Sequence, residues 1–292
     1  MNGALLVDKP AGVTSHDVVA IVRRTLGTKS VGHTGTLDPF ATGLLVVLVG
    51  KATRLARFLD GFEKEYEATI RLGQGSDTDD STGTLGSRVA SRESSEAEVR
   101  AALDGFVGTQ QQLPPAYSAK KVDGQRAYAR ARKGEEVVLK PVEVTIHAAE
   151  LLRYAWPDAE IRVRVSTGTY VRSLARDLGA KLGVPAHCAA LRRTGIGRFR
   201  VEGAQALEAI QGGQAVGRSG GQQLIPMIEL VGHLTQQEVT EEESVHLSHG
   251  RAIEGRAEGE AVALVRSGEL LAIAKMKDGK AHPAVVLMDG AA

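Results

Sequence analysis

Apolar and polar positions along the first two thirds of the chain predict an irregular succession of strands and helices. Residues 3–10 and 44–49 are apolar runs typical of buried strands, and Lys64–Leu72 alternates apolar and polar positions as a half-buried strand does. Residues 15–27 carry apolar positions at helical spacing, with Ser15 as the expected N-cap and Gly27 at the end. Further expected elements are helices at 52–61, 96–103 (after a capping box of Ser95 and Glu98) and 170–182, and a strand at 161–165.

The pattern changes after Pro226. Residues 211–223 are rich in Gly and Gln and are typical of a flexible loop, whereas short apolar segments follow at 244–247, 261–265, 270–275 and 283–288. The sequence therefore predicts an α+β fold with a mixed sheet over residues 1–228 and a small all-β domain over 229–292.

Composition places the chain among ordinary globular proteins. Its 292 residues are 42% hydrophobic, which suffices for a substantial core. The first residues lack a signal-peptide pattern and no apolar run is long enough to span a bilayer, so a cytoplasmic protein is expected. Cys188 is the only cysteine, which excludes an internal disulfide and CxxC motifs, and it is expected to be a small buried residue. His246 and His249, on an expected strand and turn, lack further metal ligands at suitable spacing.

Charge is distributed unevenly. The formal net charge is only +1, but residues 161–200 hold nine Lys and Arg against Asp177 alone, and residues 238–260 hold seven Glu against two Arg. This asymmetry fits one surface that faces a polyanion. An ordinary mosaic of solvated charges is the alternative, and composition does not separate the two.

The loop GHTGTLDPFATG, residues 32–43, combines three glycines with one carboxylate before a proline. Pro39 fixes its own φ and restricts Asp38, while the glycines permit close approach of another molecule. Taken alone, Asp38 is more typical of a turn cap than of a catalytic group. The loop is not a phosphate-binding loop, because Leu45 and Ala52 stand where Gly and Ser or Thr are required before and after Lys51. Gly195 and Gly197 lack the third glycine of a dinucleotide site.

The same loop resembles the catalytic motif of the TruB family of tRNA pseudouridine synthases. Five further segments match that family in order: LLVDKPAGVTSHDVV, KEYEATIRLGQGSDTDD, QLPPAYSAKKVDGQRAYARARKG, STGTYVRSLARDLG and AHCAALRRTGIGRF. The resemblance covers residues 4 to about 210. It implies the pseudouridine synthase fold and the isomerisation of uridine at position 55, in the T arm of tRNA, without a cofactor or metal.

By resemblance, Asp38 is the catalytic nucleophile. The reaction detaches the uracil from C1′, turns it and rejoins it through C5, after the nucleotide has flipped out of the RNA. A carboxylate that can attack and later depart suits attack at C1′ of the ribose or at C6 of the base, and both routes stay open.

The resemblance also assigns roles to residues around Asp38. Arg172 matches the arginine that pairs with the catalytic aspartate, as a guanidinium would to keep a desolvated carboxylate ionised. Tyr66 matches the tyrosine that stacks on the base and is proposed to help remove the C5 proton, and Tyr170 matches a wall of the uracil pocket. Periodicity alone would make Tyr66 a core residue, and a structural surface arginine is the alternative for Arg172.

Three further residues follow from the same motifs. Leu191 matches an apolar residue that lines the pocket. His33 matches the histidine that fills the space left in the RNA loop when the target nucleotide flips out. Asp80 falls where the family has a further active-site aspartate.

The family also implies how the rest of the chain meets RNA. Residues 117–140, with seven basic and three acidic residues, match an insertion that closes over the RNA, although a solvated helix would explain part of that charge. The C-terminal segment resembles a PUA-type RNA-binding domain. Its run of Glu241, Glu242 and Glu243 requires any RNA contact to come from another face. A monomer is expected, since the sequence has no heptad seam.

Two other functions are compatible with the residues alone. One is an RNA chaperone that grips tRNA, with catalysis secondary or lost. The other is a carboxylate-based glycosylase that releases free uracil. The effect of Asp38→Asn on tRNA binding and analysis for released base would distinguish them from an isomerase.

Overall fold

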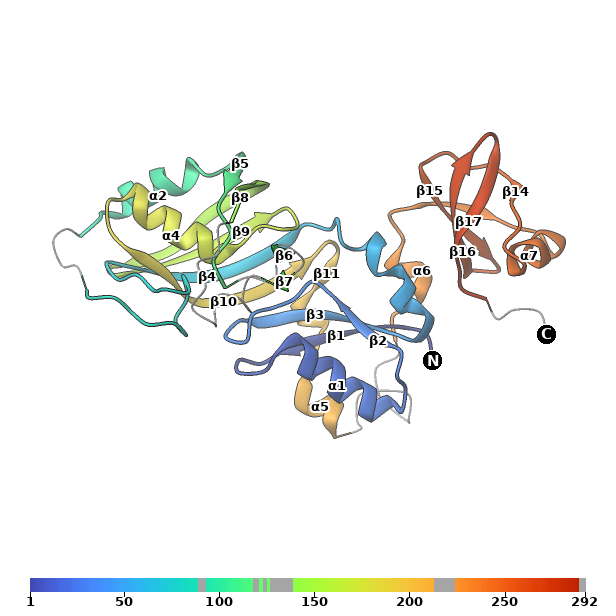
Figure 1. Cartoon of the computed structure of the whole chain (residues 1–292), viewed down its shortest axis with the longest axis horizontal. Helices are drawn as coiled ribbons and strands as arrows, with labels where there is room; N and C mark the ends of the chain where they lie inside the picture. Colours follow the sequence, from blue (N-terminus) through green and yellow to red (C-terminus); the bar gives the residue numbers. More distant parts are fainter. Residues whose placement is uncertain (89–92, 118–120, 123–124, 127–138, 213–223, 289–292) are drawn as a thin grey trace.

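Two β-sheets of different size organise the chain in a computed structural model, shown in Figure 1. The structure describes residues 1–292 except 89–92, 118–120, 123–124, 127–138, 213–223 and 289–292. A large mixed sheet carries helices on its faces, and a five-stranded sheet lies at the C-terminal end of the elongated molecule. Most of the predicted basic insertion at 117–140 and of the predicted loop at 211–223 lies outside the described residues.

The large sheet and its helices occupy the chain as far as Gln211. The elements in order are β1 (Gly3–Lys9), α1 (Ser15–Leu26), β2 (Val31–Thr34), β3 (Thr42–Val49), the 3₁₀ helix η1 (Gly50–Phe58), β4 (Lys64–Leu72), α2 (Glu96–Asp104), β5 (Gly108–Gln112), a short hairpin of β6 (Lys121–Val122) and β7 (Gln125–Arg126), β8 (Val142–Ala155), β9 (Asp158–Val165), α4 (Val171–Lys181), β10 (Ala186–Ile196), β11 (Phe199–Arg200), η2 (Val201–Gly203), β12 (Gln205–Ala206) and α5 (Leu207–Gln211).

The strand order of this sheet is β12-β1-β3-β10-β4-β9-β8-β5, with β2 beside β3 and β11 beside β10. The pairs β1–β12 and β3–β10 are parallel and the others antiparallel, so the sheet is mixed, as predicted. The parallel pair β3–β10 brings Gly43 opposite Arg193. This register joins the end of the 32–43 loop to the strand that carries Leu191.

Strand β3 is buried on both faces, which explains its uninterrupted apolar sequence. Leu45, Val47 and Val49 pack with α1 and α5, while the alternate residues pack toward η1 and the C-terminal unit. On the other half of the sheet, α2 and α4 cover one face of β4, β8, β9 and β10. The 32–43 loop therefore starts on β2 and ends on β3, two paired strands of the large sheet, of which β3 is almost wholly buried.

The C-terminal unit has the strand order β13-β15-β16-β17-β14. It follows the short helix α6 (Met227–Leu230) and comprises β13 (Thr235–Glu238), α7 (Glu241–Ser248), β14 (Ile253–Glu254), β15 (Ala261–Arg266), β16 (Glu269–Lys277) and β17 (Lys280–Val286). One apolar cluster joins this sheet to the larger one, through residues such as Leu55, Leu230 and Ile273. Arg54 and Arg57 of η1 also donate to the carbonyls of Val286 and Ala284.

Two local predictions were wrong, and a third element differs in its bounds. Residues 244–247 lie in α7 instead of a strand, because Thr240 and Glu243 form a capping box that starts a helix. The N-cap of α1 is Thr14, not Ser15, since Thr14 accepts from the Asp17 N–H. The expected helix at 52–61 is the 3₁₀ helix η1, which starts at Gly50. No helix within the described ranges is long and apolar enough to cross a membrane.

Candidate active site

The loop that carries Asp38 is held by buried polar groups. Ser15 accepts from the Leu37 N–H at 2.9 Å and donates to the Leu37 carbonyl at 3.2 Å, so the residue before Asp38 is bound from both sides. Lys9 is fully buried, and its Nζ donates to the carbonyls of Pro10, Val13 and Pro39. Burial lowers the pKa of Lys9 to about 8. These contacts fix the turn on both sides of Asp38.

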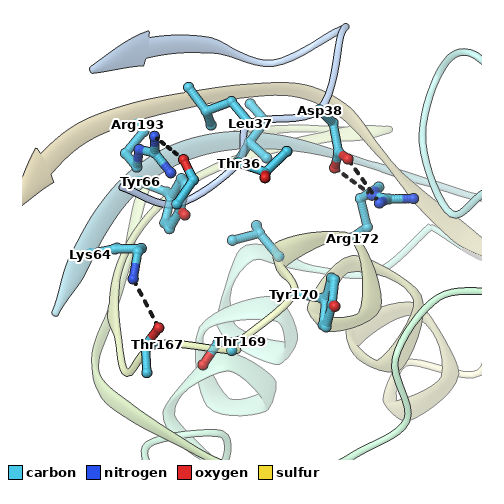
Figure 2. A pocket seen from close by; sticks show the side chains of 14 residues that line it. Thr36, Leu37, Asp38, Lys64, Tyr66, Thr167, Thr169, Tyr170, Arg172 and Arg193 are labelled. Atoms are coloured by element: carbon cyan, nitrogen blue, oxygen red, sulfur yellow. Dashed lines mark hydrogen bonds and ion pairs between the residues drawn. The ribbon is translucent and has the colours of Figure 1, made fainter. Parts of the chain in front are cut away.

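Arg172 contacts both carboxylate oxygens of Asp38, as Figure 2 shows. The Nη2 of Arg172 donates to Oδ1 at 3.1 Å, and Nε lies 2.8 Å from Oδ2 as an ion pair without hydrogen-bond alignment. The Arg172 side chain is 4% exposed and that of Asp38 is 35% exposed. One face of the carboxylate is therefore paired inside the protein while the other stays accessible.

Arg172 is itself held by several oxygens. Nη1 donates to the Thr78 carbonyl and lies 3.4 Å from Asp80 Oδ2, and Nη2 also donates to the Tyr117 carbonyl. Asp80 is buried, and its Oδ1 accepts from the hydroxyls of Thr78 and Thr82. Asp80 thus lies behind Arg172 and fixes its orientation.

The charge state of Asp38 results from opposing effects. Burial raises its pKa, the Arg172 guanidinium lowers it, and the nearby Asp80 carboxylate raises it again. The pKa remains above its ordinary value of 3.8. A carboxylate with a raised pKa and one open face is a stronger base and nucleophile than a solvated one.

Asp38 and Arg172 line a pocket of about 230 Å³. Tyr66 from β4 and Tyr170 at the N-cap of α4 form aromatic walls (Figure 2). Leu191 from β10 adds an apolar wall. Gln112 fixes the backbone at Tyr170, since its side chain bonds both the N–H and the carbonyl of that residue. Five of the seven predicted site residues thus meet in one cavity: Asp38, Tyr66, Tyr170, Arg172 and Leu191.

The other two predicted residues do not line the pocket. Asp80 reaches it only through Arg172. His33 lies on β2, opposite Val47 of β3, at the far end of the loop. Its Nδ1 is buried and has no hydrogen-bond partner among the residues that the structure describes, and burial lowers the pKa of the ring, which favours its neutral form.

Sequence reasoning missed two cations of the pocket. Lys64 from β4 donates to the Thr167 hydroxyl at 3.1 Å, and Arg193 from β10 donates to the carbonyls of Leu44 and Gly35. Arg193 is fully buried although it was counted among the residues of a polyanion-facing surface. The position of Arg193 in the pocket follows from strand pairing, which places it opposite Tyr66 of β4 and Gly43 of β3. This pairing is known only once the sheet is known.

Most cations of the basic segment 161–200 are paired with carboxylates of the same protein, several of them at the surface. Six of its nine cations contact carboxylates: Arg162, Arg164, Arg172, Arg176, Arg192 and Arg198. A net count along the sequence therefore overstates the charge that this segment presents to solvent.

Cys188 is buried, as predicted, and burial raises the pKa of its thiol. The described part of the chain contains no group of three or more side chains suited to hold a metal ion.

Family comparisons agree with this geometry. Residues 23–171 match the N-terminal domain of TruB family pseudouridylate synthases, and residues 172–230 match the tRNA pseudouridylate synthase B C-terminal domain. The chain is 46% identical to a tRNA pseudouridine synthase B of Thermobifida fusca, over 98% of both proteins. It is 50% identical to the protein of that name from Opitutus terrae, over 72% of this chain and 88% of the relative.

Solved structures show the same fold. A chain of a Cbf5-Nop10-Gar1 complex superposes with a TM-score of 0.73 at 27% identity, covering 98% of this chain and 85% of that one. A chain of an H/ACA RNP bound to a substrate RNA containing 2′-deoxyuridine gives a TM-score of 0.74 at 25% identity, with the same coverage. With matched models over residues 23–230 and such relatives over nearly its whole length, the chain belongs to the TruB family of pseudouridylate synthases.

Proposed function

We propose that this protein isomerises uridine to pseudouridine at position 55, in the T arm of tRNA, with Asp38 as the nucleophile. The observation that carries the proposal is the carboxylate of Asp38, which is bound by Arg172 on one side and open to a pocket on the other. Relatives named tRNA pseudouridine synthase B support the choice of tRNA.

Each residue in or near the pocket has a role that suits its chemistry. Arg172 keeps Asp38 ionised and oriented, and Asp80 keeps Arg172 in place. Tyr66 and Tyr170 offer rings between which a flipped uracil stacks, Leu191 closes the apolar side, and the Tyr66 hydroxyl assists removal of the C5 proton. His33, outside the pocket, occupies the place that the flipped nucleotide leaves in the RNA.

The proposal assigns the rest of the chain by resemblance. Residues 1–228 form the catalytic domain, the insertion at 117–140 closes over the RNA, and residues 229–292 form a PUA-like domain. The five-stranded C-terminal sheet and its own apolar cluster support that division. The protein acts as a monomer on cytoplasmic tRNA, and light scattering would test the expected mass of 30.9 kDa.

Chemical mapping of pseudouridine tests the function. Purified protein is incubated with an unmodified tRNA transcript, and the modified position is located by a reagent that marks pseudouridine. We expect modification at position 55, and an unchanged transcript would overturn the proposal. Free uracil in the same reaction would indicate a glycosylase. Because isomerisation leaves the mass unchanged, intact-mass analysis does not report the product.

A further inference from the structure

Two cations of the pocket, Lys64 and Arg193, donate hydrogen bonds to neutral groups. Among the residues that the structure describes, Lys64 and Arg193 make no ion pair, and their hydrogen bonds go to neutral oxygens of Phe62, Thr167, Gly35 and Leu44. The carboxylates beside Lys64 in sequence are engaged elsewhere. Glu63 binds Arg164, and Glu65 accepts from the Thr194 hydroxyl. Arg172, by contrast, has both Asp38 and Asp80.

Lys64 and Arg193 converge at Gly35. A Cβ placed on Gly35 would lie 3.3 Å from Lys64 Cε and 3.6 Å from Arg193 Nη1, so both side chains face the same side of this glycine. Figure 2 shows them on the side of the pocket opposite Asp38 and Arg172. Nη1 of Arg193 is buried, and none of the residues in the described ranges forms a hydrogen bond with it.

Burial and mutual repulsion make it unfavourable for Lys64 and Arg193 to carry their positive charges side by side. Burial and the neighbouring Arg193 lower the pKa of Lys64 to about 8, and these effects outweigh the opposing Asp60. Two cations repel each other more strongly in a partly desolvated site than in water, and attraction to a neighbouring anion offsets that repulsion. A bound anion would relieve this repulsion.

We propose that Lys64 and Arg193 form a subsite for negative charge on the flipped uridine nucleotide, at the end of the pocket opposite Asp38. Lys64 contacts the charged group directly, and the covered Arg193 adds its charge through the pocket wall. This inference rests on the proposed function. It specifies what the second end of that pocket recognises.

Two parts of the nucleotide can supply the charge. One is a flanking backbone phosphate. The other is the uracil ring, because displacement at C1′ leaves the electron pair of the broken bond on N1, and addition at C6 moves a pair of ring electrons onto O4. Either route of attack therefore makes the ring anionic while it lies in the pocket. A phosphate contact strengthens binding, whereas a contact with the ring anion accelerates the chemical step.

Lys64→Gln tests the subsite, because Lys64 is only partly buried. The conservative variant is Lys64→Arg, and Arg100→Gln on the exposed face of α2 removes one exposed charge as a control. The substrates are a T-arm stem–loop RNA and the same RNA with neutral methylphosphonate linkages on both sides of the target uridine. The dissociation constant and the single-turnover rate constant are measured separately.

We expect Lys64→Gln to lose on the order of 10- to 100-fold in one of these two quantities, with Lys64→Arg and Arg100→Gln near the parent. A loss of affinity that disappears with the neutral linkages assigns the phosphate. A loss of rate that persists with them assigns the uracil ring. Values within twofold of the parent in both quantities and with both RNAs would overturn the proposal.

Failure of the proposed function is a separate result. If the wild-type protein binds the stem–loop without forming pseudouridine, that function is wrong. The affinity of Lys64→Gln then decides the subsite alone, since a loss supports it and parental affinity overturns it.

Discussion

Arg172 lies against both carboxylate oxygens of Asp38, with Nε 2.8 Å from Oδ2 and Nη2 3.1 Å from Oδ1. The guanidinium comes from the start of α4 and the carboxylate from the loop between β2 and β3, so the fold joins two distant segments at this pair. Burial acts against ionisation of Asp38 and Arg172 acts for it. The balance between them should govern how activity depends on pH.

Arg172→Lys should lower the single-turnover rate constant on the order of 10- to 100-fold at pH 7, because an ammonium cannot bind both oxygens. Arg172→Met should also move the acid limb of the pH–rate profile to higher pH. Its missing charge leaves burial and Asp80 to raise the pKa of Asp38 further, and the nucleophile must be ionised. Rates measured from pH 5 to 9 check both expectations.

Arg100→Met is a matched control for these variants. Arg100 pairs with Glu96 on the exposed face of α2, and such a pair contributes about 0–1 kcal/mol. Its pH–rate profile should coincide with that of the parent. An Arg172→Met profile that coincides with it as well would show that Arg172 does not set the ionisation of Asp38.

Gly43→Ala should destabilise the protein by more than Gly27→Ala. Both glycines have positive φ, but a Cβ at Gly43 would lie 2.3 Å from the Arg193 carbonyl oxygen, whereas Gly27 has open space. Gly27, with φ of 61°, lies in the left-handed helical region, so Gly27→Ala measures the strain of that conformation without a clash, roughly 1–2 kcal/mol, whereas φ of 103° at Gly43 is less favourable for a side chain. In Gly43→Ala the new methyl group would also push β3 away from β10, which should lower the free energy of unfolding further. Urea unfolding compares the two, and equal losses would show that the strands separate freely.

Tyr66→Phe should separate stacking from proton removal. The ring that lines the pocket is retained, so the affinity for RNA should stay within about twofold, while loss of the hydroxyl should slow isomerisation roughly 100-fold. Tyr66→Leu should weaken both. Full activity in Tyr66→Phe would restrict this residue to stacking.

Glu243→Gln should lower stability only where Glu243 is ionised. Hydrogen bonds from Arg256, with a smaller effect from Thr240, lower the pKa of Glu243 from 4.5 to about 2. Its contribution is therefore complete above pH 4.5 and is lost as the pH falls toward 2. Because Arg256 is 40% exposed, solvent screens the pair, and we expect about 1 kcal/mol at pH 7. The difference between the parent and variant free energies of unfolding should shrink from pH 7 to pH 3; a constant difference would contradict this cause.

Sequence patterns predicted the elements that bury one regular face or both faces. The apolar run of β3, the alternation of β4 and the helix α4 were confirmed, because each of these segments buries a face or a whole strand. Strand β10 was not predicted, since Arg192 and Arg193 interrupt its apolar positions. The misassigned helix α7 has few apolar residues, and its capping box was overlooked.

The candidate site was predictable where a motif carried it. Asp38, Tyr66, Tyr170, Arg172 and Leu191 came from the resemblance, and the structure brings them to one pocket. Lys64 and Arg193 could not be found in this way. A buried cation has no signature in a charge count, and the place of Arg193 depends on a strand register that joins residues far apart in the chain.

The most direct test of the account is the single-turnover rate of pseudouridine formation in unmodified tRNA by wild-type protein and by Asp38→Asn. Asn keeps the size of the side chain and removes its negative charge. We predict that wild-type protein modifies position 55 and that the variant binds tRNA with nearly unchanged affinity but reacts on the order of 10⁴-fold more slowly or not at all. Pseudouridine formation by Asp38→Asn at a rate near that of the wild type would contradict the role of Asp38 as nucleophile.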